Sequence, residues 1–216
     1  MLLLAIDTAT PSVGVALCRD GAELTRYAVV DARRHNETLA VGVADVLARA
    51  GVTPRQLEGI AVGVGPGPYT GMRVGLITAR SLGHALGIAV YGVCSLDTLA
   101  AAAGLPGEFM VATDARRKEV YWARYCDGVR IAGPDVALPG VVAYDGPVVG
   151  EGAVLYPAAF PDARTPLYPD PTQLARLVEA TLATGGDCLP PEPLYLRRPD
   201  AVEPGQRKKV AQPTAS

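Results

Sequence analysis

The sequence predicts an α/β fold of two related lobes, of which the second is reduced. The main observation is a repeat, because the layout of residues 3–21 returns 107 positions later at residues 110–128. Each copy has an apolar run that ends in Asp, a turn, a second apolar run and an Asp-Gly pair, which is typical of a β-meander. Helix-forming sequence follows each copy, so each meander is expected to belong to an α/β lobe. The identical pairs are Ala5/Ala112, Asp7/Asp114, Val13/Val120, Ala16/Ala123, Asp20/Asp127 and Gly21/Gly128.

Helices and strands are expected to follow each meander. The Asp20-Gly21 pair suits a tight hairpin turn, and Gly51 suits the left-handed end of a helix. The predicted elements are strands at 2–6, 12–18 and 22–30, a helix at 35–50, a strand at 59–64, a helix ending near 86, a strand at 88–93, a helix at 95–103, a second meander at 109–132, a strand near 148 and a helix at 172–183. The predicted lobes are residues 1–105 and 106–198. The polar tail 199–216, which contains Arg207-Lys208-Lys209, is expected to be disordered.

Composition narrows the class of protein. The 216 residues are 49% hydrophobic and 19% charged, with a net charge of −2, which indicates a globular chain. A protein that binds nucleic acid alone usually carries a basic surplus, so any such role is expected to be shared. Four scattered cysteines without a CxxC pair favour reduced thiols and a cytoplasmic location.

The N-terminal apolar run ends at Asp7 without a basic start, so no signal peptide is expected. The apolar stretch Val74–Val93 contains Arg80, which favours a buried helix and strand over a membrane span.

Two loops have the residue types that bind phosphate. The turn at residues 7–10 offers an Asp, hydroxyls and backbone N–H groups, which suit a phosphate and a hydrated magnesium ion. The loop at residues 65–71 is rich in glycine and leads into a helix whose N-terminus attracts anions, although it is not a Walker A motif. Each loop also has a purely structural alternative. Residues 7–10 could form a turn bonded to its own backbone, and residues 65–71 could form a strand-to-helix elbow whose glycines serve packing. The candidate residues are Asp7, Thr8, Gly65, Gly67, Thr70 and Gly71.

Two predicted helices carry stripes of small residues. Small residues four apart lie on one side of a helix and allow close approach of another backbone. The second of these helices is apolar around most of its circumference, so part of it is expected to contact another protein. Packing on the chain's own sheet is the alternative. The candidate interface residues are Ala40, Ala44, Ala48, Gly75, Ala79 and Gly83.

Several catalytic signatures are missing from the sequence. The only histidines are His35 and His84, and neither HExxH nor a Cys/His cluster occurs, so a zinc or iron centre is not expected. No nucleophile elbow is present either. The chain looks like an actin-like fold, and these absences predict that it lacks catalytic residues and a metal site.

Four segments resemble the TsaB (YeaZ) family, which consists of small relatives of the glycoprotease-like TsaD proteins. Residues 4–10 resemble the family's opening strand and turn. Residues 65–75, GPGPYTGMRVG, are similar to its GPGSFTGxRxG signature. Residues 114–121 resemble its DAR…EVY segment, and residues 193–197 resemble its P-x-Y-L-R segment. The resemblance covers almost the whole chain and implies an ASKHA (actin/hexokinase/Hsp70-like) fold, a duplicated ribonuclease-H-like architecture.

The sequence departs from the family and its catalytic relatives at two places. Residues 133–149 are short and rich in proline, so a helix of the second lobe is expected to be missing. The HxxxH metal segment of the larger TsaD-type paralogue falls at residues 95–99, where Ser95 and Leu99 replace the histidines.

The resemblance implies a role in a complex rather than catalysis by the chain itself. The expected partner is the catalytic TsaD-type paralogue, paired through the small-residue helices, together with a TsaE-type ATPase. That complex transfers threonylcarbamoyl to adenosine 37 of tRNAs that read codons starting with A, so the chain is expected to reach tRNA indirectly. No cofactor is expected to be required, and ATP or ADP would bind at an interface of the complex. A homodimer is expected without the partner, and Gly75→Trp or Gly83→Trp should block pairing in a folded chain.

Two other functions are considered. A stand-alone actin-like kinase or ATPase would use Asp7, Thr8 and the loop at residues 65–71 to bind Mg-ATP. A metallopeptidase would need the absent HxxxH segment.

Overall fold

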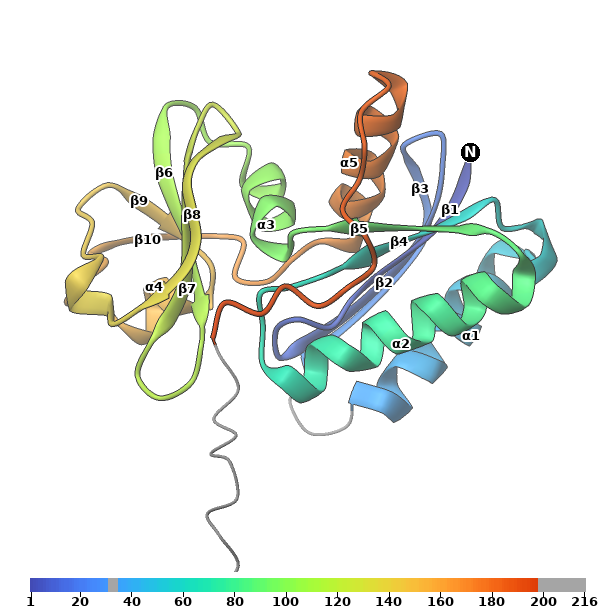
Figure 1. Ribbon diagram of the computed structural model, residues 1–216, viewed down its shortest axis with the longest axis horizontal. Coiled ribbons are helices and arrows are strands. Elements are labelled where there is room, and N and C mark those ends of the chain that lie inside the picture. The colour runs from blue at the N-terminus through green and yellow to red at the C-terminus, as the bar shows by residue number, and fades with distance from the viewer. Residues whose placement is uncertain (31–34, 198–216) are drawn as a thin grey trace, which may run out of the picture.

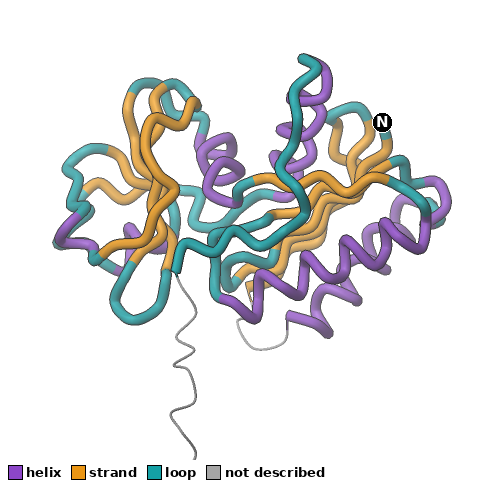
Figure 2. Tube along the Cα trace, viewed as in Figure 1, coloured by secondary structure: helices purple, strands orange, loops and turns teal. Residues whose placement is uncertain are grey.

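The computed structural model describes residues 1–30 and 35–197, which form two five-stranded sheets flanked by helices (Figures 1 and 2). The first sheet has the order β3-β2-β1-β4-β5, and the second has the order β10-β9-β6-β7-β8. Read in reverse, the second order matches the first strand by strand, with β1 to β5 corresponding to β6 to β10 in turn. This match confirms the predicted repeat. The first-sheet strands are β1 (Leu2–Asp7), β2 (Ser12–Arg19), β3 (Ala22–Val30), β4 (Gly59–Gly63) and β5 (Ala89–Val93). The second-sheet strands are β6 (Glu108–Asp114), β7 (Val120–Cys126), β8 (Val129–Ala137), β9 (Pro147–Val149) and β10 (Asp162–Arg164).

The same turn closes the same hairpin in both sheets. Asp20 and Gly21 have φ of 50° and 74°, and Asp127 and Gly128 have φ of 49° and 79°. Two successive residues with positive φ are what a two-residue hairpin loop of type I′ requires, and Asp-Gly is a favoured sequence for it. The turn prediction is therefore confirmed in both copies.

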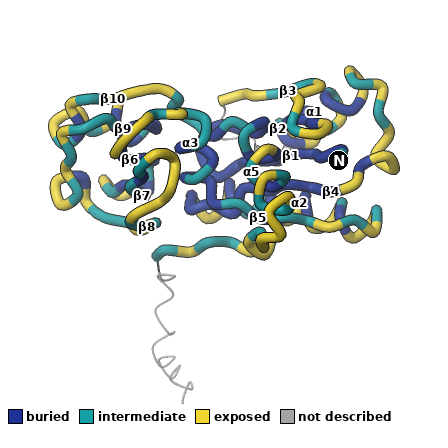
Figure 3. Tube along the Cα trace, turned by 90° about the horizontal axis from the view of Figure 1, so that it is seen from above, coloured by how far each residue is buried: buried dark blue, intermediate teal, exposed yellow. Residues whose placement is uncertain are grey.

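Helices cover both faces of the first sheet. The helices of the described chain, over both lobes, are α1 (His35–Ala50), α2 (Tyr69–Leu86), α3 (Ser95–Ala103), α4 (Glu151–Leu155) and α5 (Pro171–Ala183). Two 3₁₀ turns are also present, η1 (Pro54–Gln56) and η2 (Pro139–Val141). Helices α1 and α2 lie on one face and α5 lies on the other (Figure 1). Because successive strand residues point to opposite faces, Leu4 and Ile6 join the core under α1 and α2, while Leu3 and Ala5 join the core under α5. Strands β1 and β4 are accordingly buried along their whole length (Figure 3).

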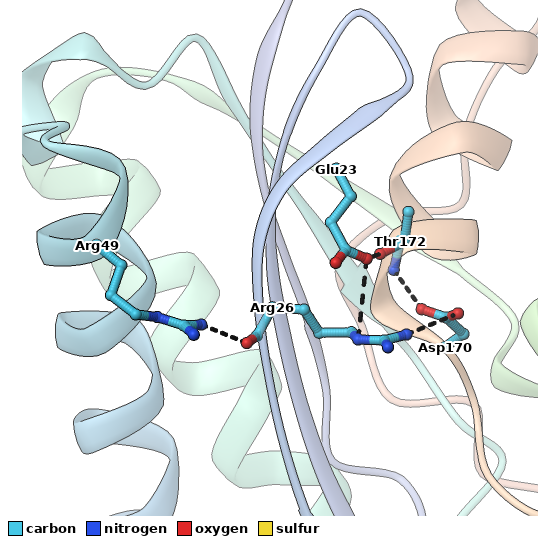
Figure 4. Close-up of polar contacts among 5 residues, drawn as sticks. All are labelled: Glu23, Arg26, Arg49, Asp170 and Thr172. Atoms are coloured by element: carbon cyan, nitrogen blue, oxygen red, sulfur yellow. Dashed lines mark hydrogen bonds and ion pairs between the residues drawn. The ribbon is translucent and has the colours of Figure 1, made fainter.

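Each lobe receives a helix from the other half of the chain. Helix α3 follows the first sheet but packs on β6, β7 and β9, whereas α5 follows the second sheet but packs on the first. Polar contacts hold the start of α5 against β3 (Figure 4). Asp170 caps α5 by accepting from the Thr172 amide at 2.9 Å and pairs with Arg26 at 3.3 Å, and Thr172 donates to Glu23. On the other side of the strand, Arg49 of α1 donates to the carbonyl of Arg26.

The second lobe is reduced, as expected. Between β8 and β9 the chain makes only the short turn η2, where the first lobe has α1, and α4 has 5 residues where α2 has 18. Pro139 and Gly140 within this turn do not favour a longer helix.

The C-terminal segment of the described chain, residues 189–197, forms a strap across both lobes (Figure 1). Leu189 exchanges two backbone hydrogen bonds with Gly92 of β5, and the Leu194 amide donates to the Val64 carbonyl at 2.9 Å. The Leu194 side chain packs against the cores of both lobes. The strap therefore fixes one lobe against the other.

Most of the predicted elements are present within about two residues of their expected ends, while α4 and β10 were not predicted. The stretch from Val74 to Val93 forms most of α2 and strand β5, as expected. Within residues 1–30 and 35–197, no helix is both long enough and apolar enough to cross a membrane. The predicted disordered tail lies outside the described residues.

Candidate functional site

The first candidate loop is directed into the protein. Asp7 ends β1 and is only 2% exposed. Its carboxylate accepts hydrogen bonds from the Ala9 amide at 2.8 Å and from the Ser95 hydroxyl at 2.7 Å. Burial raises the pKa of Asp7 above its ordinary value. The carboxylate is thus bonded to its own chain at the junction of β1 and α3.

Thr8 joins this turn to the start of α2. Its hydroxyl donates to the Gly71 carbonyl at 2.8 Å and accepts from the Gly75 amide at 3.0 Å. Both of these backbone groups belong to α2, so the hydroxyl ties the turn to the first part of this helix.

The glycine-rich loop packs against the same turn. A Cβ on Gly67 would lie 2.2 Å from the Ala9 carbonyl oxygen, so only glycine fits this approach. Gly65 has φ of +93°, and its carbonyl accepts from the Ser95 amide at 2.7 Å. Thr70, by contrast, is exposed. The structure therefore brings five of the six candidate residues together, but mainly through contacts with one another.

Ser95 is a site residue that sequence reasoning noted only as the replacement of a histidine. It bonds Asp7 through its side chain and Gly65 through its backbone, so it connects both candidate loops. Leu99, at the second histidine position, is fully buried in the core beneath the second sheet. Within the described residues, no three His, Cys, Asp or Glu side chains gather in a way that could hold a metal ion.

The small-residue stripe of α2 faces the chain's own sheet, which corrects the prediction that it is exposed to a partner. Gly75, Ala79 and Gly83 are all buried. A Cβ on Gly75 would lie 2.5 Å from the Thr8 hydroxyl oxygen, and one on Gly83 would lie 2.4 Å from a Val90 methyl group. A tryptophan at either glycine would collide with the sheet, so the expectation of a folded tryptophan variant is wrong.

The small-residue stripe of α1 lies on the outside of the helical layer. Ala40, Ala44 and Ala48 are exposed. Two larger apolar side chains on these helices are also exposed, Val41 of α1 at 58% and Ile77 of α2 at 56%. These five residues define the outer helical face, an apolar surface on the side of α1 and α2 away from the sheet.

A cavity of about 380 Å³ lies between the lobes. It was not predicted as a site, although three of the segments that resemble the TsaB family meet in it, namely the glycine-rich loop, the turn between β6 and β7, and the strap. These segments are far apart in the sequence, and only the fold brings them together. The lining residues are Gly67, Pro68, Tyr69, Ala115, Arg116, Arg117, Tyr121, Leu194, Tyr195, Leu196 and Arg197.

Basic and aromatic side chains dominate this interlobe cavity. Arg116 pairs with Asp114 at 3.2 Å, and Arg197 pairs with Glu119. The Tyr121 hydroxyl of the second lobe donates to the Gly67 carbonyl of the first at 3.4 Å. At the rim, the rings of Tyr69 and Tyr195 stack with centroids 5.4 Å apart, and the Arg73 guanidinium lies 4.7 Å from the Tyr69 ring centroid. The cavity is thus lined by ion-paired arginines and bordered by aromatic rings.

Comparison with known proteins identifies the family. A family model described as tRNA N6-adenosine threonylcarbamoyltransferase (TsaD) matches residues 29–147. The solved structure of YeaZ from Pseudomonas aeruginosa is 31% identical, and the match covers 90% of this chain and 99% of that chain with a TM-score of 0.78. The chain belongs to the TsaB/YeaZ family. Its duplicated two-lobed architecture is therefore the predicted ASKHA fold.

Other relatives of this TsaB/YeaZ chain show how far the similarity extends. An uncharacterized protein of Mycobacterium tuberculosis is 45% identical over 202 residues, which cover 92% of this chain and 93% of that protein. The tRNA threonylcarbamoyladenosine biosynthesis protein TsaB of Escherichia coli is 36% identical over 128 residues, covering 58% of this chain and 55% of that protein.

Proposed function

We propose that the chain is the non-catalytic partner subunit of the complex that installs threonylcarbamoyl on adenosine 37 of tRNAs that read codons starting with A. Its family supports this role, because the TsaB relatives of Escherichia coli and Bacillus subtilis are named for tRNA threonylcarbamoyladenosine biosynthesis. The proposed partner is the TsaD-type catalytic subunit, with a TsaE-type ATPase as a third component.

The observation that carries the non-catalytic part of the proposal is the closure of the Asp7 turn. Asp7 and Thr8, which could contact a metal–nucleotide complex, make their hydrogen bonds to Ala9, Ser95, Gly71 and Gly75. A ligand would have to break these buried bonds before the same atoms could bind it. We therefore place any ATP or ADP at an interface of the complex and not in these loops.

The outer helical face is the proposed pairing surface. It combines three exposed alanines with Val41 and Ile77 on two adjacent helices. Small side chains allow another helix to approach closely, and burial of apolar surface favours association. The same face would support a homodimer when the TsaD-type subunit is absent.

Light scattering on a sizing column tests the proposal, with the chain measured alone and mixed with the TsaD-type subunit from the same source. We expect a homodimer alone and a 1:1 heterodimer in the mixture. Val41→Arg and Ile77→Arg should remove the heterodimer while the chain stays folded, because each places a charge on the apolar face. Val129→Arg is the matched control, since Val129 is 67% exposed on β8 of the second lobe. Wild-type chain that elutes unchanged beside the TsaD-type subunit would refute the proposed function.

A further inference from the structure

We infer that the pairing surface for the TsaD-type subunit extends beyond the outer helical face, across the start of α2 and onto the strap. Its far end consists of Tyr69, Arg73 and Tyr195, which are called the tyrosine–arginine cluster below. The inference rests on the proposed function for the identity of the partner. It goes beyond that function because it gives the C-terminal strap a direct contact with the partner.

Two segments that are far apart in the sequence build the cluster. Tyr69 and Arg73 belong to the segment 65–75 and Tyr195 to the segment 193–197, and both segments resemble motifs of the family. The strap runs past the start of α2 (Figure 1), and the two rings stack with centroids 5.4 Å apart and planes 17° apart. The Arg73 guanidinium lies 4.7 Å from the Tyr69 ring centroid and donates to the Tyr69 hydroxyl. The fold thus forms the cluster in advance of any partner.

The rings of the cluster stay open to solvent although other groups anchor the strap. Tyr69 is 57% exposed and Tyr195 is 45% exposed. The strap is held by backbone hydrogen bonds of Leu189 and Leu194 and by the Leu194 side chain, which packs against both cores. Tyrosine and arginine are enriched in protein–protein interfaces, where they supply much of the binding energy. The exposed cluster therefore suits contact with another protein.

A groove of about 300 Å³ along α2 connects the cluster to the outer helical face. Its lining includes Tyr69, Arg73 and Ile77, which are four residues apart and so lie along one side of the helix. Ile77 is 56% exposed and belongs to the outer helical face. A partner seated on Ile77 would meet Arg73 about one turn away and Tyr69 about two turns away. The cluster therefore continues the proposed pairing surface without a break.

The charge of α2 indicates the chemistry of the partner surface. This helix contains Arg73 and Arg80 and no Asp or Glu. Within residues 1–30 and 35–197, Arg73 interacts with the ring and hydroxyl of Tyr69 and not with a carboxylate. A guanidinium has five N–H donors, so a second group can still bind to it. We expect the partner to place an apolar side chain in the groove and a carboxylate opposite Arg73.

Isothermal titration calorimetry of the full chain with the TsaD-type subunit from the same source tests the inference. Tyr195→Ala and Arg73→Ala should each raise the Kd about 30-fold or more, as expected for residues that dominate an interface. Tyr195→Phe should pair like the wild type because it keeps the ring. The matched controls are Tyr144→Ala and Arg124→Ala, which should also pair like the wild type. They remove an equivalent pair on the second lobe, where the Arg124 guanidinium lies 5.3 Å from the Tyr144 ring centroid.

The outcomes separate this inference from the proposed function. Wild-type affinity in Tyr195→Ala and Arg73→Ala, with pairing lost in Ile77→Arg, would overturn the inference and leave the proposed function standing. A wild-type chain that does not pair would overturn both. Equal losses in the cluster variants and the second-lobe controls would overturn the inference, because they would reflect a general loss of stability.

Two further measurements complete the test. Thermal unfolding of each variant shows whether it is folded, and Arg73→Ala remains decisive if Tyr195→Ala unfolds, because alanine favours a helix. Exposed aromatic rings beside arginine also suit RNA bases, so binding of a tRNA anticodon stem–loop to the assembled complex is measured as well. Unchanged pairing together with weaker RNA binding in the cluster variants would overturn the inference and assign the cluster to RNA.

Discussion

Asp7 shows how one residue of a repeated motif can acquire a structural role. Its counterpart in the second half, Asp114, is partly exposed and pairs with Arg116 beside the interlobe cavity. Asp7 instead lies under α3 and bonds to Ser95. The repeat therefore places two carboxylates at equivalent positions with different surroundings, one buried in the core and one at a surface.

The buried carboxyl should make stability depend on pH. Burial raises the pKa of Asp7 in the folded chain, so the folded state holds this proton more tightly than the unfolded state. Its contribution to stability is full below the unfolded pKa and is lost as the pH rises through the folded pKa. Asp7→Asn has no such proton, so the free energy of unfolding of the wild type should fall relative to that of the variant as the pH rises above about 4, the pKa of an ordinary Asp.

Urea unfolding at a series of pH values measures this difference. Asp187→Asn provides the control, since Asp187 is exposed near the end of α5. If the wild-type and Asp7→Asn curves run parallel across the range, Asp7 does not have the raised pKa.

Sequence reasoning found the residues of the loops but not their role. Asp, Thr and glycine are the residue types of both phosphate loops and tight packing turns, and the two uses differ only in what fills the space between the loops. Here Ser95 and the first two turns of α2 fill it. The cavity arginines could not be grouped from the sequence, because Arg116 and Arg197 meet only through the strap.

At the scale of elements, helix α2 is positioned by its glycines. Gly75→Ala should lower the free energy of unfolding by about 1–3 kcal/mol, because its methyl group would displace the Thr8 hydroxyl from two buried hydrogen bonds. Gly140→Ala is the matched control, since its Cβ would meet nothing within 4 Å. Chemical denaturation of both variants tests this, and an unchanged midpoint for Gly75→Ala would show that α2 does not pack so closely on the turn.

The elements themselves were predictable where their signals were long. The meanders were marked by apolar runs and Asp-Gly turns, and α1, α2 and α5 by helix-forming runs of 13 residues or more. Helix α4 and strand β10, with 5 and 3 residues, are too short for a periodic pattern. Which sheet α3 and α5 cover was not predictable, because an apolar helix face does not specify its partner.

At the scale of the whole molecule, the strap couples the lobes. Leu194→Ala should lower the free energy of unfolding by about 2 kcal/mol or more, because the side chain contacts both cores. The loss should also make the lobes less cooperative, seen in calorimetry as a van't Hoff enthalpy below the calorimetric enthalpy. Leu189→Ala is the control, since Leu189 is 43% exposed and contacts β5 through its backbone. A Leu194→Ala thermogram that overlays the wild type would exclude this coupling.

The exchange of α3 and α5 also sets the order in which the chain can become complete during synthesis. The first sheet ends at Val93, but the helix that covers one of its faces begins only at Pro171. At translation rates of about 5–20 residues per second, that face leaves the ribosome roughly 4–16 seconds before helix α5, which covers it. Leu3, Ala5 and Ala61 on that face would meanwhile be open to chaperones or to other nascent chains. A gene split between the lobes would make two fragments that each lack a covering helix, so we expect them to fold only when produced together.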